Sequence, residues 1–238
     1  MRSAYMIVVI VVVTGICYLM ILGAFVRNLI FGSDDGRLGH RIAGIWGRTI
    51  FRLIPGWKIT IKGEQNLPKA DQPTVMVANH ESMADIAAMY FLKVQFRWLS
   101  KEEVFRYPVI GHAMRIAGYV PVRRGDRNSH AQAMDESANR IRLGLSMFFF
   151  PEGTRSETGE LRPFKVGAFK LARDTGVPIL PIALHGAGQL LRKGTLIPHR
   201  AEVKVAILPM VTDDGTLELE EFAAKVRGII AEEHRRLF

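Results

Sequence analysis

The sequence predicts an α/β fold, a mixed sheet flanked by helices, with an N-terminal membrane helix. Short apolar runs that suit strands alternate with longer segments of helical periodicity, the pattern of layered α/β domains. An uncharged apolar stretch of membrane-spanning length precedes the first of these strands. The chain has 238 residues, of which 48% are hydrophobic, so it can bury a full core.

Composition excludes several classes of protein. A net charge of +9 accompanies the high apolar content, whereas a disordered basic tail would be poor in apolar side chains. The single cysteine, Cys17, excludes a disulfide-stapled scaffold. The positive charge favours an anionic partner, either a nucleic acid or a phospholipid surface. The basic residues form no aromatic-interleaved stripe and no nucleic-acid motif, so we predict no nucleic-acid partner.

The first element is the apolar stretch at residues 4–26, which contains no charged residue. As a helix it rises roughly 34 Å, enough to cross a bilayer's hydrocarbon core, and both a spanning helix and one lying in a single leaflet fit it. A cleaved signal peptide fits less well, since the stretch is long and no small-x-small site follows. The segment that follows is basic, with Arg27, Arg37, Arg41, Arg48 and Arg52. Such charge predicts localisation at the inner or cytoplasmic membrane, with the bulk of the chain on the cytoplasmic side.

The next element is an amphipathic helix at residues 38–53, where apolar residues recur at three- and four-residue spacing. It fits an interfacial helix on a membrane and equally a helix packed on the rest of the protein. Pro55 and Gly56 then break the pattern. We therefore assign residues 1–54 to a membrane anchor with this helix, and residues 55–238 to an α/β domain.

The α/β domain is predicted to begin with a half-buried strand at residues 57–62, where apolar and polar residues alternate. Apolar runs predict further strands at residues 74–78, 96–99, 119–122, 146–150, 177–184 and 202–208. Helical periodicity predicts helices at residues 82–92, 104–117 (broken at Pro108), 129–143, 166–175 and 217–237.

The heptapeptide NHESMAD at residues 79–85 lies where a buried strand passes into a helix, a common place for functional side chains in α/β sheets. His80 and Asp85 would not face each other within one regular helix. They meet if His80 lies in the turn and Asp85 lies in the first helical turn. A histidine held by a carboxylate is a general base of fixed tautomer. The structural alternatives are an ordinary loop histidine and a capping box from Ser82 to Asp85.

Three further blocks stand out. FPEGTRS at residues 150–156 combines a glycine that permits close backbone approach with Arg155, a bidentate fork for phosphate. GYVPVRR at residues 118–124, preceded by Lys101, ends in an arginine pair that fits an anion site or a solvated charge cluster. VPILPI at residues 177–182 is an apolar strand flanked by prolines, which packing alone explains.

Several catalytic and metal-binding motifs are missing from the sequence. It contains no Walker phosphate loop, no GxSxG elbow, and no cluster of Cys and His at metal-ligand spacing. Ala84 stands where an HExxH motif needs its second histidine. We therefore predict no metal site and no bound cofactor.

Taken in order, these blocks resemble the glycerolipid acyltransferase family, specifically the 1-acyl-sn-glycerol-3-phosphate (lysophosphatidic acid) acyltransferases. The resemblance covers roughly residues 57–210 and includes a GxExLP turn at residues 63–68. One departure is Arg123, which stands where the family often has an acidic residue. Arg124 is therefore the better counterpart of the family's arginine, with Arg123 as a helper at most.

The resemblance implies a glycerol-3-phosphate acyltransferase-like fold and a reaction. An acyl chain would pass from acyl-CoA or acyl carrier protein to the free hydroxyl of 1-acyl-glycerol-3-phosphate, giving phosphatidic acid. His80 would be the base and Asp85 would hold it. The residues implied to bind the substrate phosphate are Arg124, Arg155 and Lys101, and those implied to line the acceptor site are Glu152, Gly153 and Thr154.

Two alternatives remain open at this point. The acceptor can be another lysolipid, such as lyso-ornithine lipid or a lysophospholipid. The chain can also be a catalytically silent membrane lipid-binding protein. The expected partners are a phospholipid membrane surface, lysophosphatidic acid and an acyl-CoA or acyl carrier protein donor.

Overall fold

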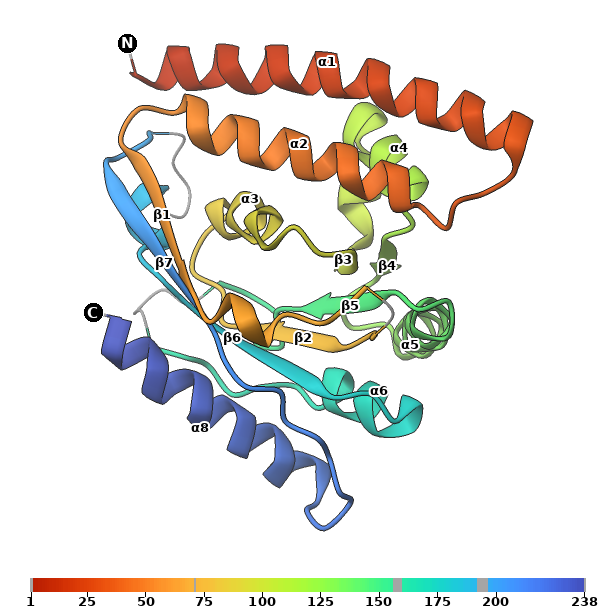
Figure 1. The fold of residues 1–238 in the computed structure, drawn as a ribbon, viewed down its shortest axis with the longest axis vertical. Coiled ribbons are helices and arrows are strands. Elements are labelled where there is room, and N and C mark those ends of the chain that lie inside the picture. Colours follow the sequence, from red (N-terminus) through yellow and green to blue (C-terminus); the bar gives the residue numbers. More distant parts are fainter. Residues whose placement is uncertain (1, 71, 156–159, 192–196, 238) are drawn as a thin grey trace.

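The computed structural model describes residues 2–70, 72–155, 160–191 and 197–237. Within these ranges a seven-stranded sheet carries helices on both faces (Figure 1). Two long helices, α1 (Arg2–Phe31) and α2 (Arg37–Leu53), run antiparallel to each other above one of these faces (Figure 1). The mixed α/β fold class and the N-terminal apolar helix predicted from the sequence are confirmed.

The sheet has the strand order β1-β7-β6-β2-β5-β3-β4. Its neighbouring strands are parallel, except that β6 and β7 are antiparallel. The strands are β1 (Trp57–Lys62), β2 (Val75–Ala78), β3 (Phe96–Lys101), β4 (Val120–Val122), β5 (Ser146–Phe149), β6 (Ile179–His185) and β7 (Ala201–Ile207). Each corresponds to a predicted strand. β2, β5 and most of β6 are fully buried, as expected of central parallel strands covered on both faces.

The domain's helices are α3 (Ala84–Met89), α4 (Pro108–Ile116), α5 (Arg127–Arg142), α6 (Gly167–Thr175), α7 (Ala187–Leu190) and α8 (Leu219–Leu237). Short 3-10 turns occur at Glu64–Asn66, Tyr90–Leu92 and Glu102–Arg106. Pro108 opens α4, because the residue before a proline is extended and proline fits the first helical turn. Helix α7 was not predicted from the sequence, since four residues show no periodicity.

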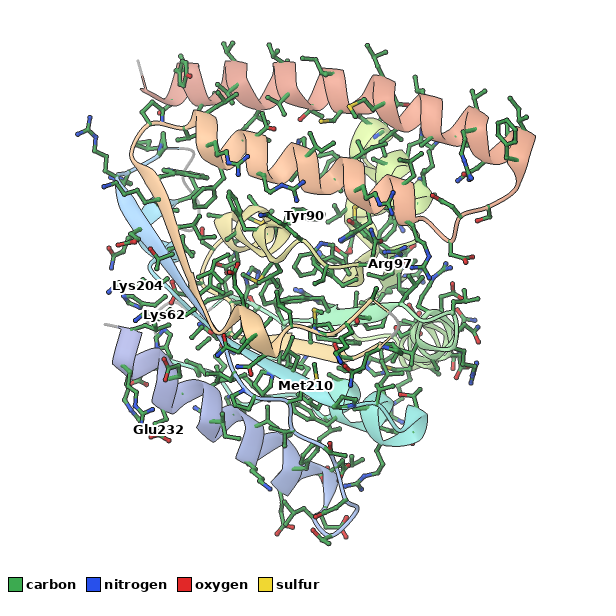
Figure 2. All side chains as sticks on the ribbon, in the orientation of Figure 1. Lys62, Tyr90, Arg97, Lys204, Met210 and Glu232 are labelled. Atoms are coloured by element: carbon green, nitrogen blue, oxygen red, sulfur yellow. The ribbon has the colours of Figure 1, made fainter. Side chains whose placement is uncertain are left out.

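Helix α2 packs between α1 and α3 (Figure 1). Glycines allow α2 to approach its neighbours closely: a Cβ on Gly47 would lie 2.4 Å from the ring of Tyr90, which follows α3, and one on Gly39 would lie 2.8 Å from the backbone of Ala117, which follows α4. Tyr90 directly follows α3, and the fully buried Arg97 lies in β3 and donates to the carbonyl of Asp35, just before α2 (Figure 2). Of the two alternatives for this amphipathic segment, the structure shows the packed helix. The division of the chain into two domains at residue 54 stays a prediction.

Helix α1 has one buried face and one exposed face. The buried residues recur every three or four positions and pack in one cluster with α2; they are Met6, Val9, Val13, Cys17, Ile21 and Ala24. The opposite face exposes large apolar side chains, Val12 and Leu19 among them. By length and composition the helix could cross a membrane, which makes it a candidate for the predicted anchor.

The course of the chain creates a crevice beside the central strands. After β2 the chain enters α3, which packs in the core cluster on one face of the sheet. After the adjacent β5 it reaches α6, which packs in the cluster on the opposite face. When two neighbouring parallel strands connect to helices on opposite faces of the sheet, a crevice opens at the carboxyl ends of the strands. Ligands usually bind in this crevice. The segments following β2 and β5, which carry NHESMAD and FPEGTRS, meet there.

Candidate active site

The turn after β2 brings His80 and Asp85 together. His80 Nδ1 lies 2.7 Å from Asp85 Oδ2, with His80 in the turn and Asp85 in the first turn of α3, as the sequence analysis required. The same oxygen accepts the backbone N–H groups of Glu81 (2.8 Å) and Ser82 (2.9 Å). Asp85 therefore holds the histidine and also accepts the Ser82 N–H, which is one half of the capping box that the sequence allowed; the Ser82 hydroxyl donates instead to the carbonyl of Leu191.

Asp85 is completely buried. Burial raises the pKa of its carboxyl group, and the hydrogen bond from His80 acts in the opposite direction. The second oxygen, Oδ1, has no hydrogen-bond partner among the described residues, which adds to the cost of burying the charge. The two backbone N–H donors on Oδ2 favour the ionised form, which can only accept, so the short contact with His80 Nδ1 needs a proton on that nitrogen. His80 Nδ1 consequently carries a proton, and Nε2 is left as the acceptor.

The ring of His80 is fixed from a second side by Phe150, the first residue of FPEGTRS. The two rings stack with centroids 4.0 Å apart and planes inclined by 14°. His80 retains 14% side-chain exposure and lies on the wall of a large cavity. The imidazole is thus held at Nδ1 and on one face, while it remains accessible to a bound molecule.

Glu152 lies behind this turn, which corrects the expectation that it lines the acceptor site. Its Oε1 accepts the backbone N–H of His80 at 2.8 Å, and its Oε2 accepts that of Arg162 at 3.0 Å. The side chain is buried, and burial raises its pKa. Because both oxygens are taken by backbone groups, Glu152 joins the segment after β5 to the segment after β2 and does not face the cavity.

The cavity has a volume of about 880 Å³ and is basic on one side. The other predicted site residues do line it, namely Lys101, Arg123, Arg124, Gly153, Thr154 and Arg155. Lys165 also contributes and was missed, because a lone lysine in a loop has no sequence pattern. It approaches closely because residue 153 is a glycine: a Cβ there would lie 2.9 Å from Lys165 Nζ. Ser156, which completes FPEGTRS, lies outside the described residues.

The basic side chains of the cavity differ in their partners. Arg123 is held by Glu102, with Nε 2.7 Å from Oε2, and this pairing with Arg123 and Arg106 lowers the pKa of Glu102 to about 2. Lys101 lies 3.0 Å from Glu103, in an exposed pair. Arg124 and Arg155 form no ion pair with any residue that the structure describes. These two arginines keep their charge available for an anion.

The opposite side of the cavity is apolar and was not predicted. It is formed by side chains of α1, α2 and α4, including Cys17, Tyr18, Ile21, Ile42, Trp46, Ile110 and Ala113. No local pattern relates these residues to the motifs, because they meet His80 only through tertiary packing. The cavity therefore joins an apolar end, a histidine–carboxylate pair and a basic end.

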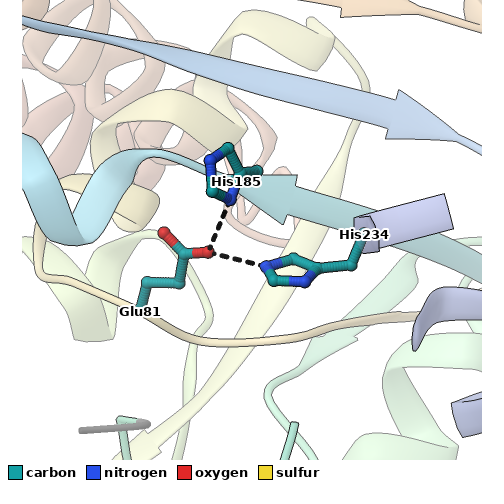
Figure 3. A group of neighbouring side chains, drawn as sticks. All are labelled: Glu81, His185 and His234. Atoms are coloured by element: carbon teal, nitrogen blue, oxygen red, sulfur yellow. Dashed lines mark hydrogen bonds and ion pairs between the residues drawn. The ribbon is translucent and has the colours of Figure 1, made fainter. Parts of the chain in front are cut away.

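A second polar cluster lies beside the same turn and was also missed. Glu81, His185 and His234 come together although they are far apart in the sequence (Figure 3). The expectation of no metal site was based on spacing along the chain, which cannot detect such a group.

Comparison with known proteins places these features in context. The sequence model of the acyltransferase family matches residues 58–185. The chain is 37% identical over 206 residues to 1-acyl-sn-glycerol-3-phosphate acyltransferase BAT2, chloroplastic, of Brassica napus, covering 81% of this chain and 59% of that protein. It is 40% identical over 196 residues to 1-acyl-sn-glycerol-3-phosphate acyltransferase LPAT1, chloroplastic, of Arabidopsis thaliana, covering 82% and 54%.

The chain thus spans between half and three-fifths of the length of these curated relatives. A solved structure shares the fold over the whole chain. It is the crystal structure of PlsC, the 1-acyl-sn-glycerophosphate (LPA) acyltransferase from Thermotoga maritima, with a TM-score of 0.81 and 24% identity. That match covers 100% of this chain and 98% of the other.

Proposed function

We propose a specific reaction for this chain, which belongs to the acyltransferase family: transfer of an acyl group from an acyl thioester to the free hydroxyl of 1-acyl-glycerol-3-phosphate, giving phosphatidic acid. The observation that carries the proposal is the cavity that joins the His80–Asp85 pair to an apolar wall and to two arginines, Arg124 and Arg155, that form no ion pair with a described residue. A lysophosphatidate has the matching parts: a hydroxyl, a phosphate and an acyl chain. The names of the similar plant proteins support this substrate.

In the proposed mechanism His80 is the general base. Nε2 accepts the proton of the glycerol hydroxyl while the oxygen attacks the thioester carbonyl carbon. The C–S bond then breaks, and the thiolate leaves with the electron pair and takes the proton from His80. Asp85 keeps the proton on Nδ1 and stabilises the imidazolium that forms between these steps. General base catalysis of this kind accelerates a reaction by about 10²–10⁴-fold.

Arg124 and Arg155 are the proposed phosphate ligands, with Lys101 in support. Arg155 is partly buried and follows the segment that Glu152 ties to the His80 backbone. A phosphate held by these side chains would orient the glycerol hydroxyl toward His80, and such positioning contributes much of the rate gain of an enzyme. The apolar wall formed by α1, α2 and α4 would take the acyl chains.

The acyl donor is proposed to be acyl-CoA or an acyl carrier protein. Both carry the acyl group as a thioester, whose thiolate leaves readily, so no acyl-enzyme intermediate is required. The two donors share the phosphopantetheine arm and differ in what is attached to it. A donor comparison with both thioesters therefore belongs in the test of the function.

The test is an acceptor and donor panel with the purified full chain in detergent. Acyl-CoA and acyl-acyl carrier protein are each offered with lysophosphatidate, glycerol-3-phosphate, lysophosphatidylcholine and lyso-ornithine lipid. We expect phosphatidic acid to form fastest, from lysophosphatidate. Preference for an acceptor without a phosphate monoester would overturn the substrate assignment. The absence of product with every pair would favour the silent lipid-binding protein.

The exposed apolar face of α1 is proposed to insert into a phospholipid membrane. The other face of α1 packs on α2, and residues of both helices line the cavity. Insertion of α1 would therefore place the cavity at the lipid surface, where the acceptor and the product reside. Vesicle flotation tests this with two adjacent residues, Val12, which is 52% exposed, and Val13, which is 7% exposed. Val12→Asp should lower vesicle binding without lowering Tm, whereas Val13→Asp should lower Tm. Unchanged flotation of Val12→Asp would contradict insertion of this face.

A further inference from the structure

Three polar side chains from separate elements converge beside the turn that carries His80. Glu81 lies in that turn, His185 ends β6, and His234 lies on α8 (Figure 3). Their side chains are 11%, 13% and 4% exposed, respectively. Glu81 Oε1 lies 3.0 Å from His234 Nε2 and 3.8 Å from His185 Nδ1, and the three donor atoms all lie within 4.8 Å of one another. The proposed acyl transfer uses none of the three.

The donor set is one that metals use. Two imidazole nitrogens and one carboxylate oxygen are typical ligands of Zn²⁺, with metal–ligand distances of about 2.0–2.2 Å. Two such ligands of a tetrahedral ion lie about 3.3 Å apart. The distances from Glu81 to the two histidines lie on either side of this value. Small side-chain rotations would therefore bring all three atoms onto one ion.

The surroundings hold the ligands in place. Glu81 Oε2 accepts the backbone N–H of Gly188 at 3.1 Å, which turns Oε1 toward the imidazoles. The charge of Lys204, which pairs with His185 in the β6–β7 register, opposes a cation. Its ammonium group donates to the carbonyl of Leu237 at 2.7 Å, which reduces that effect.

We propose that Glu81, His185 and His234 bind one Zn²⁺ ion that fastens α8 and β6 to the turn carrying His80. Glu81 directly follows His80 in the chain, so an ion at this position would restrain the backbone of the proposed base. The competing arrangement uses the same atoms as a hydrogen-bonded cluster, with His234 donating to Glu81. Metal binding does not depend on the proposed reaction, and the two can be tested separately.

The experiment measures zinc binding by the untagged full chain after dialysis against a chelator. Isothermal titration and metal analysis should give one Zn²⁺ per chain with a Kd of about 10⁻⁷ M or lower. Co²⁺ should bind with the intense visible absorption of a tetrahedral site, and Mg²⁺, which prefers oxygen ligands, should not compete. His234→Ala should weaken Zn²⁺ binding at least about 100-fold, because one of three ligands is lost. His199→Ala is the matched control, since His199 is an exposed histidine outside the cluster.

Thermal unfolding gives a second readout that does not depend on activity. Zn²⁺ should raise the Tm of the wild type and of His199→Ala by several degrees, and should leave His234→Ala unchanged, because an ion that binds only the folded state stabilises it by mass action. Failure of the folded wild type to bind stoichiometric zinc would overturn the proposal, whatever the variants do. Equal zinc affinity in the wild type and a folded His234→Ala would also overturn it and would leave a hydrogen-bonded cluster only.

Discussion

The turn after β2 and the basic end of the cavity are built in opposite ways. In the turn, nearly every polar group has a partner within the protein. The Asn79 side chain exchanges two hydrogen bonds of 2.8 Å with the backbone of Leu184. Ser82 Oγ donates to the carbonyl of Leu191 at 2.7 Å, and His80 is held by Asp85 and Phe150. The turn is therefore ordered before any substrate binds.

At the basic end, the two arginines proposed to bind phosphate have no such partners among the residues that the structure describes. Arg124 and Arg155 form no ion pair with a described residue, whereas their neighbour Arg123 is tied to Glu102. This difference between the turn and the basic end matches two different tasks, proton transfer and anion binding. Groups that move a proton need fixed geometry, because small displacements are costly in rate. Groups that bind an anion need uncompensated charge, which internal ion pairs would remove.

Loss of His80, the proposed base, should have the largest effect. His80→Ala should lower kcat by about 10²–10⁴-fold, since it removes the proton acceptor while the basic end is intact. The acceptor KM should change little. Initial rates of acyl transfer measure this, with a thermal melt as the control for folding. Wild-type turnover by a folded His80→Ala protein would show that the ordered turn is not the catalytic part.

Loss of an unpaired arginine should come next and should affect binding. Arg155→Ala and Arg124→Ala should each raise the acceptor KM by about 10–100-fold, the worth of a charge-assisted hydrogen bond. Arg123→Ala, the matched control, should raise it much less, because Glu102 already neutralises Arg123. Steady-state kinetics with varied lysophosphatidate distinguish them. If Arg123→Ala had the larger effect, or if only the donor KM rose, the distinction between paired and unpaired arginines would be wrong.

Loosening the support of the turn should have a moderate effect. In Glu152→Gln the amide nitrogen cannot accept a hydrogen bond, so the backbone N–H of either His80 or Arg162 loses its partner. We expect kcat to fall about 10-fold with the acceptor KM nearly unchanged. Glu103→Gln, at an exposed pair, serves as the control. A rise in KM without a fall in kcat would show that Glu152 contacts the acceptor after all.

The smallest expected effect concerns acid stability at the basic end. Arg123 and Arg106 lower the pKa of Glu102 from 4.5 to about 2 in the folded protein. The stabilisation is therefore complete above pH 4.5 and is lost as the pH falls through 2. Melting curves of the wild type and Glu102→Gln should differ slightly at pH 6, because an exposed pair contributes little, and should converge as the pH approaches 2. A difference in Tm between the two proteins that grows as the pH falls would contradict the pairing of Glu102 with Arg123 and Arg106.

The sequence predicts the strands, because β2, β5 and β6 are continuous apolar runs between turns. It also gives the condition under which His80 and Asp85 meet, with His80 in the turn and Asp85 in the first helical turn, and the structure fulfils it. It does not predict the position of Glu152, because the two backbone N–H groups that take its carboxylate lie in other segments. The apolar wall and the Glu81 cluster were missed for a similar reason. Their members lie up to 153 residues apart and share no local pattern.

The strand order also has a consequence for how the protein is made. Helices α1 and α2 are consecutive and can pair as soon as both have been synthesised, whereas β2 must wait for its partners. Val77 pairs with Phe149, and the Asn79 side chain bonds to Leu184, 105 residues later. At about 5–20 residues per second, synthesis of that interval takes roughly 5–20 s. We therefore expect the nascent chain to display an unpaired apolar strand for seconds and to depend on chaperones, with the turn that carries His80 among the last parts to form.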